Sequence, residues 1–445
     1  MRLLNTRDLS FKDINGTEIA KYAYAILSHR WLLPEAGLEL TYKDVLRRNF
    51  KGPGYHKIWN ACHFALSRGF QWIWIDTCCI DKTSSAELTE SINSMWTWYQ
   101  QAEECYAHLA DVPSWLHRNG RGVWMEQRAP KRAGRLTAQS QKALSRSDWF
   151  RRGWTLQELL APQLLIFLNS DWKILATKHE MTDSVSAITR IPAYYLRRSH
   201  AVSKASVAMR MSWVARRVTA RTEDMAYCML GILDVNMPLL YGEGRKAFMR
   251  LQLEIIKKSD DESIFAWTTP SKSSGMLADW PTAFAASGDI MNFKVGYEHR
   301  LPYSMTNRGL ELRLPNWSFF KEKSRKGARV PARDPSYRPI NVKTKLFDDG
   351  GCDYDVPEIP DGDPCLRRIK KFQLACGSCD RIDRDLSTTS DIIVAARQRV
   401  VIITLCRMGL SWQRVNCNNL EFFPKFVDLS ESDWQTLFYV PQKGI

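Results

Sequence analysis

The sequence has little that would place the protein in a membrane or outside a cell. Its 445 residues include no run of about 20 uninterrupted apolar residues, so we expect no membrane-spanning helix. Residues 1–7 lack the apolar stretch of a secretory signal peptide. The eleven cysteines are odd in number and lack the spacing of a disulfide framework, which is typical of reduced thiols. The sequence therefore predicts a cytoplasmic protein.

Familiar functional motifs are missing too. The sequence has no GxxxxGK[ST] phosphate-binding segment, no internal repeat and no heptad array. These absences exclude a P-loop nucleotide site and a repeat sensor within this chain. Acidic residues are in deficit, because 48 of them face 63 lysines and arginines, and the net charge is +15. This excess favours anionic partners such as nucleotides, nucleic acid or anionic lipid.

Part of the positive charge is concentrated in one segment, residues 113–148. It holds eight lysines and arginines and only two acids, and it shows no strong apolar period. We interpret it as a solvated basic insertion. A nucleic-acid-binding or nuclease module that depends on Lys131, Arg132 and Arg135 is the weaker alternative. No zinc-finger, RRM or helix-turn-helix signature accompanies the segment, so we do not expect nucleic acid as a partner.

What the first half does contain is an alternation of strand and helix patterns. Continuous apolar runs, which suit strands covered on both faces, occur at residues 24–27, 72–75, 105–109 and 164–167. Helical patterns lie between or beside them at residues 41–44, 58–66, 88–102 and 154–161. This alternation predicts an α/β fold with a mostly parallel sheet and helices on both sides.

A shift in composition near residue 271 predicts a second domain. Before it, apolar stripes at helical spacing fill residues 180–260. Beyond it, Pro, Gly and Asp separate short alternating segments such as residues 310–314 and 400–404. We therefore predict a first domain over 1–270, with the basic insertion 113–148 and a helical extension 180–260, and a smaller β-rich domain over 271–445.

The most informative acid, Glu158, lies in the segment from Phe150 to Pro162. Its Leu, Gln, Glu and Ala residues favour a short helix, and Pro162 ends it. Trp154 and Glu158 are four residues apart and so share one helical face. A carboxylate among apolar neighbours is either a structural acid paired with Arg151 or Arg152, or a catalytic one. The sequence leaves both interpretations open.

Polar clusters follow the predicted strands at residues 28–31 and 76–81. In open α/β sheets, ligands gather at the carboxyl ends of strands. Arginines such as Arg30 and Arg152 suit phosphate, and Trp31 or Trp154 suits stacking on a base. This combination describes a nucleotide pocket better than a metal or acyl-transfer site.

Each of these residues also has a structural interpretation. Asp76 and Asp81 are of types that commonly cap helices or form turns. A histidine such as His29 is more often a hydrogen-bonded loop residue than a general base. Cys78 and Cys79 are adjacent, which is poor geometry for zinc, and small buried apolar residues are the better interpretation. We expect no metal site.

Three segments resemble the successive signature blocks of the fungal heterokaryon-incompatibility (HET) domain, and these are residues 24–31, 74–82 and 149–159. Residues 90–99 resemble the helix block between them, and 221–228 with 241–244 resemble the segment that follows. The resemblance covers about residues 20–267. The C-terminal third resembles a β-rich companion domain often found after HET.

The resemblance implies a fold and a function. HET domains are implicated in fungal non-self recognition and in the cell death that follows fusion of incompatible strains. They are thought to be remote relatives of TIR domains, some of which hydrolyse NAD+ with one glutamate on a helix, four positions after a tryptophan. The resemblance therefore implies a TIR-like, flavodoxin-like core in which Glu158 is the catalytic carboxylate.

Our candidate substrate-binding residues are those of the three polar clusters, namely Ser28, His29, Arg30, Trp31, Asp76, Cys79, Asp81, Arg152, Trp154 and Gln157. The chemistry of NAD+ is compatible with a single acid. Nicotinamide is already a cationic leaving group, so one carboxylate near C1′ of the ribose is sufficient. At about 4 Å and an effective dielectric of about 20, that attraction is roughly 4 kcal/mol before desolvation.

Two functional hypotheses follow from the sequence. The first is a cell-death effector that hydrolyses NAD+ to nicotinamide and ADP-ribose, with NAD+ as substrate and no cofactor. The alternative is a non-catalytic, TIR-like signalling or oligomerisation adaptor. Because the chain lacks a repeat sensor, we expect self-association or a separate sensor protein as partner.

Overall fold

The computed structural model describes residues 1–32, 35, 37–113, 116–118, 124–126, 138–270, 273–292, 303–306, 309–313, 369–379, 398–408, 411–415, 421–423 and 437–440. The chain divides into two compact units. Unit 1 comprises residues 1–258 and 279–288, and unit 2 comprises 259–278 and 289–445. The domain boundary at residue 271 stays a prediction.

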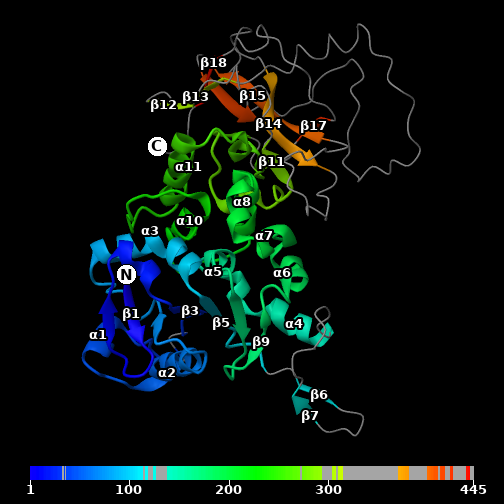
Figure 1. Cartoon of the computed structure of the whole chain (residues 1–445). Coiled ribbons are helices and arrows are strands. Elements are labelled where there is room, and N and C mark those ends of the chain that lie inside the picture. The colour runs from blue at the N-terminus through cyan, green and yellow to red at the C-terminus, as the bar shows by residue number, and fades with distance from the viewer. Residues whose placement is uncertain are drawn as a thin grey trace. The chain divides into compact units, whose positions relative to one another are not determined.

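Unit 1 is built on a mixed sheet with the strand order β2-β1-β4-β3-β5-β8-β9 (Figure 1). The four central strands, β4, β3, β5 and β8, run parallel, and β1, β2 and β9 pair antiparallel at the two edges. The strands are β1 (Arg2–Asn5), β2 (Phe11–Asp13), β3 (Ala25–His29), β4 (Trp72–Trp74), β5 (Glu104–His108), β8 (Leu165–Leu168) and β9 (Ile174–Thr177).

The sequence pattern explains which strands are central. Every residue of β3, β5 and β8 is buried, as the continuous apolar runs predict for strands covered on both faces. The edge strands β2 and β9 are partly exposed. The α/β class is thus confirmed. The antiparallel edges were not anticipated, because short half-exposed strands carry little apolar signal.

Helices and capping residues connect the strands. The helices of this part are α1 (Tyr42–Leu46), α2 (Gly52–Ser67), α3 (Ser85–Gln101), α4 (Ala138–Arg146) and α5 (Thr155–Leu160), with the 3-10 turns η1 (Gly16–Lys21) and η3 (Asp148–Arg151). Thr41 and Asp44 form a capping box at the start of α1. Gly69, at φ +92°, follows the end of α2 in the left-handed conformation that glycine adopts at low cost. A two-stranded ribbon, β6 (Leu116–Arg118) and β7 (Trp124–Glu126), lies within the basic insertion.

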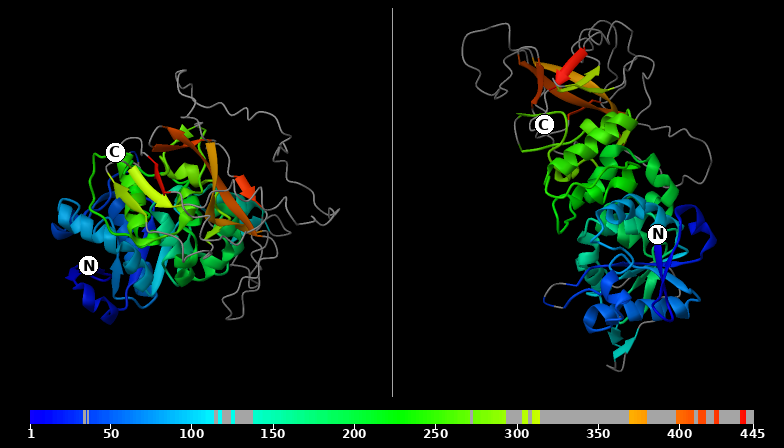
Figure 2. Two further views of the ribbon diagram at one scale, coloured as in Figure 1. Left: turned by 90° about the horizontal axis from the view of Figure 1, so that it is seen from above. Right: turned by 90° about the vertical axis from the view of Figure 1, so that its left-hand side faces the viewer.

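Most of residues 180–260 form short helices that follow the sheet in the sequence (Figures 1 and 2). The helices are α6 (Thr182–Thr189), α7 (Ala193–Arg197), α8 (Val207–Val214), α9 (Asp224–Tyr227), α10 (Leu230–Leu233) and α11 (Lys246–Lys258), with η4 (Ser199–Lys204) between α7 and α8 and η6 (Pro281–Phe284) against α8. α10 packs closely on α3 because Gly231 has no side chain. A Cβ at this position would lie 2.1 Å from Trp96 Cβ.

Unit 2 contains strands where it is described. One sheet has the order β10-β16-β15-β14-β11, with β17 also paired to β15, and a second has the order β12-β13-β18. The elements are η5 (Glu262–Phe265), β10 (Ser273–Ser274), β11 (Ile290–Asn292), β12 (Ser304–Thr306), β13 (Gly309–Arg313), β14 (Ile369–Cys379), β15 (Gln398–Met408), β16 (Ser411–Val415), β17 (Glu421–Phe423) and β18 (Leu437–Val440). Among the described residues of the chain, no helix combines the length and apolar character needed to cross a membrane.

Candidate functional site

The candidate site lies at the carboxyl ends of β3 and β5. From β3 the chain passes to β4 on one side and then returns to β5 on the other, so β3 and β5 flank a topological switch point. Ligands of open α/β sheets bind at such points. Ser28 and His29 end β3, and His29 pairs in register with His108 at the end of β5. The parallel alignment of two buried strands thus places two histidines side by side.

A short chain of buried hydrogen bonds joins this edge to α5. The Trp149 indole Nε1 donates to Ser28 Oγ at 2.8 Å, and Ser28 Oγ donates to Glu158 Oε2 at 2.5 Å. Ser28 and Glu158 are 130 positions apart in the sequence. Glu158 is only 7% exposed. The hydroxyl of Ser28 therefore links the sheet to the carboxyl group of Glu158 on the helix.

The pKa of Glu158 is raised to about 8, mainly by burial and in smaller part by the nearby carboxylate of Asp76. The hydrogen bond from Ser28 and the positive charges of Arg152 and Arg217 oppose this shift. No ion pair to Glu158 occurs within the part of the chain that the structure describes. The structural-acid interpretation through a direct pair with Arg151 or Arg152 is thus not what the geometry shows. A carboxyl group with a strongly raised pKa is a common mark of a functional site.

Arg217 contacts the start of α5, the helix that carries Glu158. A parallel bridge joins Arg152 to Val218, with Gly153 N donating to Val218 O at 2.9 Å. This bridge brings the Arg217 guanidinium to Arg152 O at 2.8 Å and to Thr155 Oγ1 at 3.0 Å. The other amine, Nη2, is buried without a hydrogen-bond partner among the described residues. Such an unpaired buried donor is unfavourable in a protein interior and is common where a ligand binds.

The two histidines are buried and neutral. Burial lowers the pKa of His29 well below its usual value, and nearby Lys57 adds to the effect. Burial lowers the pKa of His108 to about 4. Both ring nitrogens of His29 and Nε2 of His108 lack hydrogen-bond partners in the described part of the structure. His108 also stacks on Trp172, with ring centroids 4.1 Å apart.

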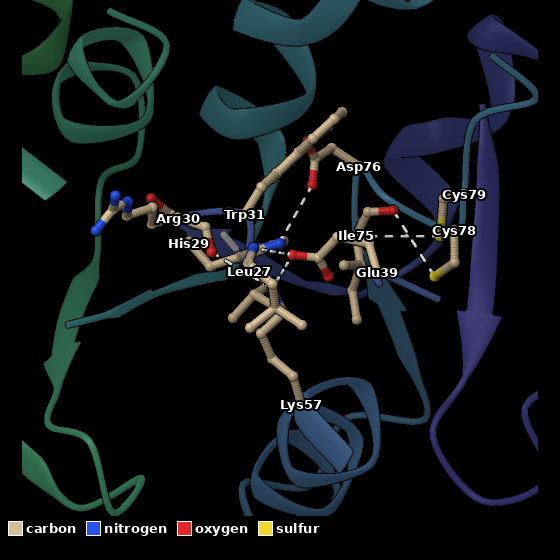
Figure 3. A network of polar contacts seen from close by, with 12 residues as sticks. Leu27, His29, Arg30, Trp31, Glu39, Lys57, Ile75, Asp76, Cys78 and Cys79 are labelled. Atoms are coloured by element: carbon tan, nitrogen blue, oxygen red, sulfur yellow. Dashed lines mark hydrogen bonds and ion pairs between the residues drawn. The ribbon is translucent and has the colours of Figure 1, made fainter. Parts of the chain in front are cut away.

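A second polar network extends from His29 toward solvent (Figure 3). Trp31 Nε1 donates to Asp76 Oδ2 at 2.7 Å, and His29 Nε2 lies 3.8 Å from Asp76 Oδ1. Trp31 is 39% exposed, and the Lys82 ammonium lies over its ring at 3.6 Å from the centroid.

Lys57 and Glu39 also belong to this network (Figure 3). Lys57 lies on α2, ion-pairs with Glu39 and donates to Arg30 O at 3.4 Å. Lys57 is buried, and the Glu39 side chain is 13% exposed. Burial lowers the pKa of Lys57, and Glu39 and Asp76 oppose that shift. The pair fixes the backbone that carries Arg30 and Trp31.

The remaining predicted site residues have diverse partners. Arg30 pairs with Asp148 at 2.5 Å, and Asp81 forms a turn by accepting from Thr83. Gln157 is buried and donates to Met95 Sδ at 3.2 Å. Buried Cys79 accepts a weak hydrogen bond from Ile75 N at 3.4 Å.

Trp154 and Arg152 differ in their surroundings. Burial raises the pKa of Asp224 on α9, and hydrogen bonds from Tyr241 and Trp154 oppose that shift, so the Trp154 indole contacts α9. Arg152 is half-buried, and no ion pair of its guanidinium occurs among the described residues. Of the predicted arginines, Arg152 is therefore the one available to an anion.

The structure brings together Ser28, His29, Trp31, Asp76 and Glu158 in one region. No group of three His, Cys, Asp or Glu side chains in the described part of the chain is placed to hold a metal ion. Lys131, Arg132 and Arg135 of the basic insertion lie outside the described residues.

Four buried residues of this region were missed at the sequence level, and these are Lys57, His108, Trp149 and Arg217. Two of them carried a signal. Lys57 stands four residues before Ala61 on the apolar stripe of α2, and His108 interrupts an apolar strand run. Nothing near Arg217 in the sequence indicates its burial.

Comparison with known proteins identifies the family of part of the chain. The family described as heterokaryon incompatibility protein (HET) matches residues 24–158, and a domain of unknown function (DUF8212) matches residues 246–320. The vegetative incompatibility protein HET-E-1 of Podospora anserina is 38% identical over 265 residues, which cover 58% of this chain but 18% of that protein. This chain thus spans less than a fifth of the length of its relative. No solved structure matches. The segment that supplies Ser28, Asp76 and Glu158 is therefore a HET domain.

Proposed function

We propose that this HET-domain protein is a cell-death effector of fungal incompatibility that hydrolyses NAD+ to nicotinamide and ADP-ribose, with Glu158 as the catalytic carboxylate. One observation carries the proposal. Glu158 lies at the carboxyl edge of the parallel strands beside the switch point, it has no ion-pair partner among the described residues, and burial raises its pKa. The name of the Podospora anserina relative supports the biological role.

The raised pKa of Glu158 fits a cationic substrate. Without substrate the buried carboxyl group is largely protonated at pH 7, because its pKa is about 8. The positive charge of the nicotinamide ribosyl group would favour the ionised form, as any opposite charge within about 4–6 Å does. The carboxylate would then stabilise the positive charge that develops at C1′ as nicotinamide leaves.

Neighbouring residues suit the rest of a dinucleotide. The unpaired guanidinium of Arg152 suits a pyrophosphate oxygen, because arginine forms strong charge-assisted bonds with phosphate. The half-exposed ring of Trp31 suits stacking on a base. The unpaired nitrogens of His29 and His108 can donate hydrogen bonds to ribose hydroxyls or accept them from these groups.

The direct test is chromatography of NAD+ incubated with purified protein at high concentration, so that assembly is not limiting. We compare the wild type with Glu158→Gln, which keeps the shape and can still accept from Ser28. Glu103→Gln, the same change at an exposed site, is the matched control. We expect nicotinamide release by the wild type and the control, and a loss of at least 100-fold in Glu158→Gln.

The pH profile provides a second readout of the same proposal. Because kcat/KM reports the ionisation of the free enzyme, it should rise with pH up to about 8, where Glu158 becomes ionised. A wild type that releases no nicotinamide, or a Glu158→Gln variant as active as the control, would exclude the catalytic role.

One observation favours the alternative, a non-catalytic adaptor. Glu158 is 7% exposed, and the cavity described below lies elsewhere in unit 1. In this case the protein would act by self-association or with a separate sensor. When expressed in fungal cells, Glu158→Gln would then remain as toxic as wild type at equal protein level. Toxicity lost together with nicotinamide release would exclude the adaptor.

A further inference from the structure

A cavity of about 300 Å3 lies at the opposite edge of the sheet from Ser28. Gln163 lies just before β8, and Lys178 follows β9, which runs antiparallel to β8. Both residues therefore mark the amino-terminal edge of the parallel strands. The wall also includes Pro162, Gln100 near the end of α3, and residues 197–200, where α7 ends and η4 begins. The proposed catalytic residues do not line this cavity.

The lining of the cavity is positive. Lys178, Arg197 and Arg198 contribute positive charge to it, and no Asp or Glu is among its lining residues. Arg198 stacks on Tyr194 at 5.0 Å, and no carboxylate partner of Arg198 occurs in the described part of the chain. Arg197 contacts Asp183 at 3.4 Å, but both side chains are exposed, so this pair contributes little stability.

Lys178 is the built component of the site. Its side chain is buried, with the residue 4% exposed, and Nζ donates to Leu159 O at 3.0 Å and to Pro162 O at 2.7 Å. An ammonium has three N–H donors, so a third remains for a ligand. Burial also lowers the pKa of Lys178 to about 8, which means that its charge is poorly compensated in the free protein.

We infer that this cavity binds a small phosphate-bearing anion, held by the ammonium of Lys178 and the guanidinium groups of Arg197 and Arg198. A guanidinium presents paired N–H donors that match phosphate oxygens, and the amides of Gln100 and Gln163 add neutral donors. The volume is at the lower end of ordinary ligand sites, which suits a small anion. This site is independent of the proposed hydrolysis at Glu158.

The test uses the full chain and inorganic pyrophosphate as probe, with affinity measured by isothermal titration calorimetry. We expect binding by the wild type that weakens as KCl is raised. The double change Arg197→Gln with Arg198→Gln should weaken it about tenfold or more, because each removes a charged hydrogen bond. Arg47→Gln, at an exposed arginine outside the cavity, should bind as the wild type does.

Two further arms separate this inference from the proposed catalytic site. Glu158→Gln should keep full affinity for pyrophosphate, and Lys178→Met should lose it even if that variant is less stable. Uncharged adenosine should not compete. No binding by the wild type at millimolar pyrophosphate, equal binding by the double arginine variant, or competition by adenosine would each overturn the assignment.

Discussion

At the scale of single residues, the buried carboxyl group of Glu158 affects the stability of the protein. The folded protein holds a proton on Glu158 up to about pH 8, whereas the unfolded chain releases it near pH 4.5. Between these values the unfolded state binds fewer protons, so wild-type stability falls as pH rises. Glu158→Gln lacks this loss. We expect its advantage in the free energy of unfolding to grow by roughly 2–4 kcal/mol from pH 5 to pH 8.5.

Urea unfolding of both proteins at pH 5, 7 and 8.5 measures this difference. The exposed change Glu103→Gln should shift stability equally at all three pH values. A constant difference between wild type and Glu158→Gln over this range would show that Glu158 ionises normally in the folded state.

Ser28 is the second residue with a specific expected effect. Its hydroxyl accepts from Trp149 and donates to Glu158, so Ser28→Ala removes two buried hydrogen bonds. We expect a loss of about 2 kcal/mol in stability. Because the Ser28 hydrogen bond lowers the pKa of Glu158, its removal should also move the rise in kcat/KM to higher pH. A loss of stability with an unchanged pH profile would mean that Ser28 only supports packing.

At the scale of elements, the contact between residues 151–153 and 217–219 positions α5. Gly153 has no space for a side chain, since a Cβ there would lie 2.5 Å from Thr219 Cγ2 and 3.1 Å from Cys228 Sγ. We therefore expect Gly153→Ala to destabilise the protein by about 1–3 kcal/mol through overpacking. The shift would also displace Arg152 and the start of α5.

A double variant tests the stated cause. Thr219→Ser removes the methyl group that Gly153→Ala would meet, so the pair should recover part of the loss in urea unfolding. Additive losses in the double variant would mean that the cost arises elsewhere, for example from the backbone of Gly153.

The strands and helices of unit 1 show what a sequence can and cannot predict. The strands β3, β5 and β8 were identified because burial on both faces leaves an unbroken apolar run. The helical pattern at residues 41–44 was identified because it is local, and the capping box that Thr41 forms with Asp44 joins residues only three positions apart. Both signals lie within a few residues.

Features that depend on distant contacts were not predictable. The edge strands β1 and β9 are short and pair antiparallel through contacts that no local pattern encodes. Arg217 reaches α5 only because Val218 bridges to Arg152. The residue type of Glu158 drew attention to it. Its hydrogen bond with Ser28, however, joins residues that only the fold brings together.

At the scale of the whole molecule, two buried histidines of the central sheet make the stability of the protein fall in acid. His29 and His108 end adjacent strands, and both are buried and neutral in the fold. A base whose folded pKa is depressed contributes stability above its unfolded pKa, and this contribution is lost as pH falls. For His108 the loss runs from about pH 6.5 down to about 4, and it amounts to roughly 3 kcal/mol.

His108→Asn should therefore make the stability of the chain less sensitive to acid, even though it loses the stack on Trp172 and starts from a lower value at pH 7. The quantity to compare is the slope of the melting temperature between pH 6.5 and pH 4.5, which should be shallower than in the wild type. His56→Asn, at an exposed histidine of α2, should leave the slope unchanged. Because protonation of His108 would place a cation at the carboxyl edge that also holds His29, the two losses should reinforce each other. Equal slopes in His108→Asn and wild type would mean that acid unfolding starts outside the sheet.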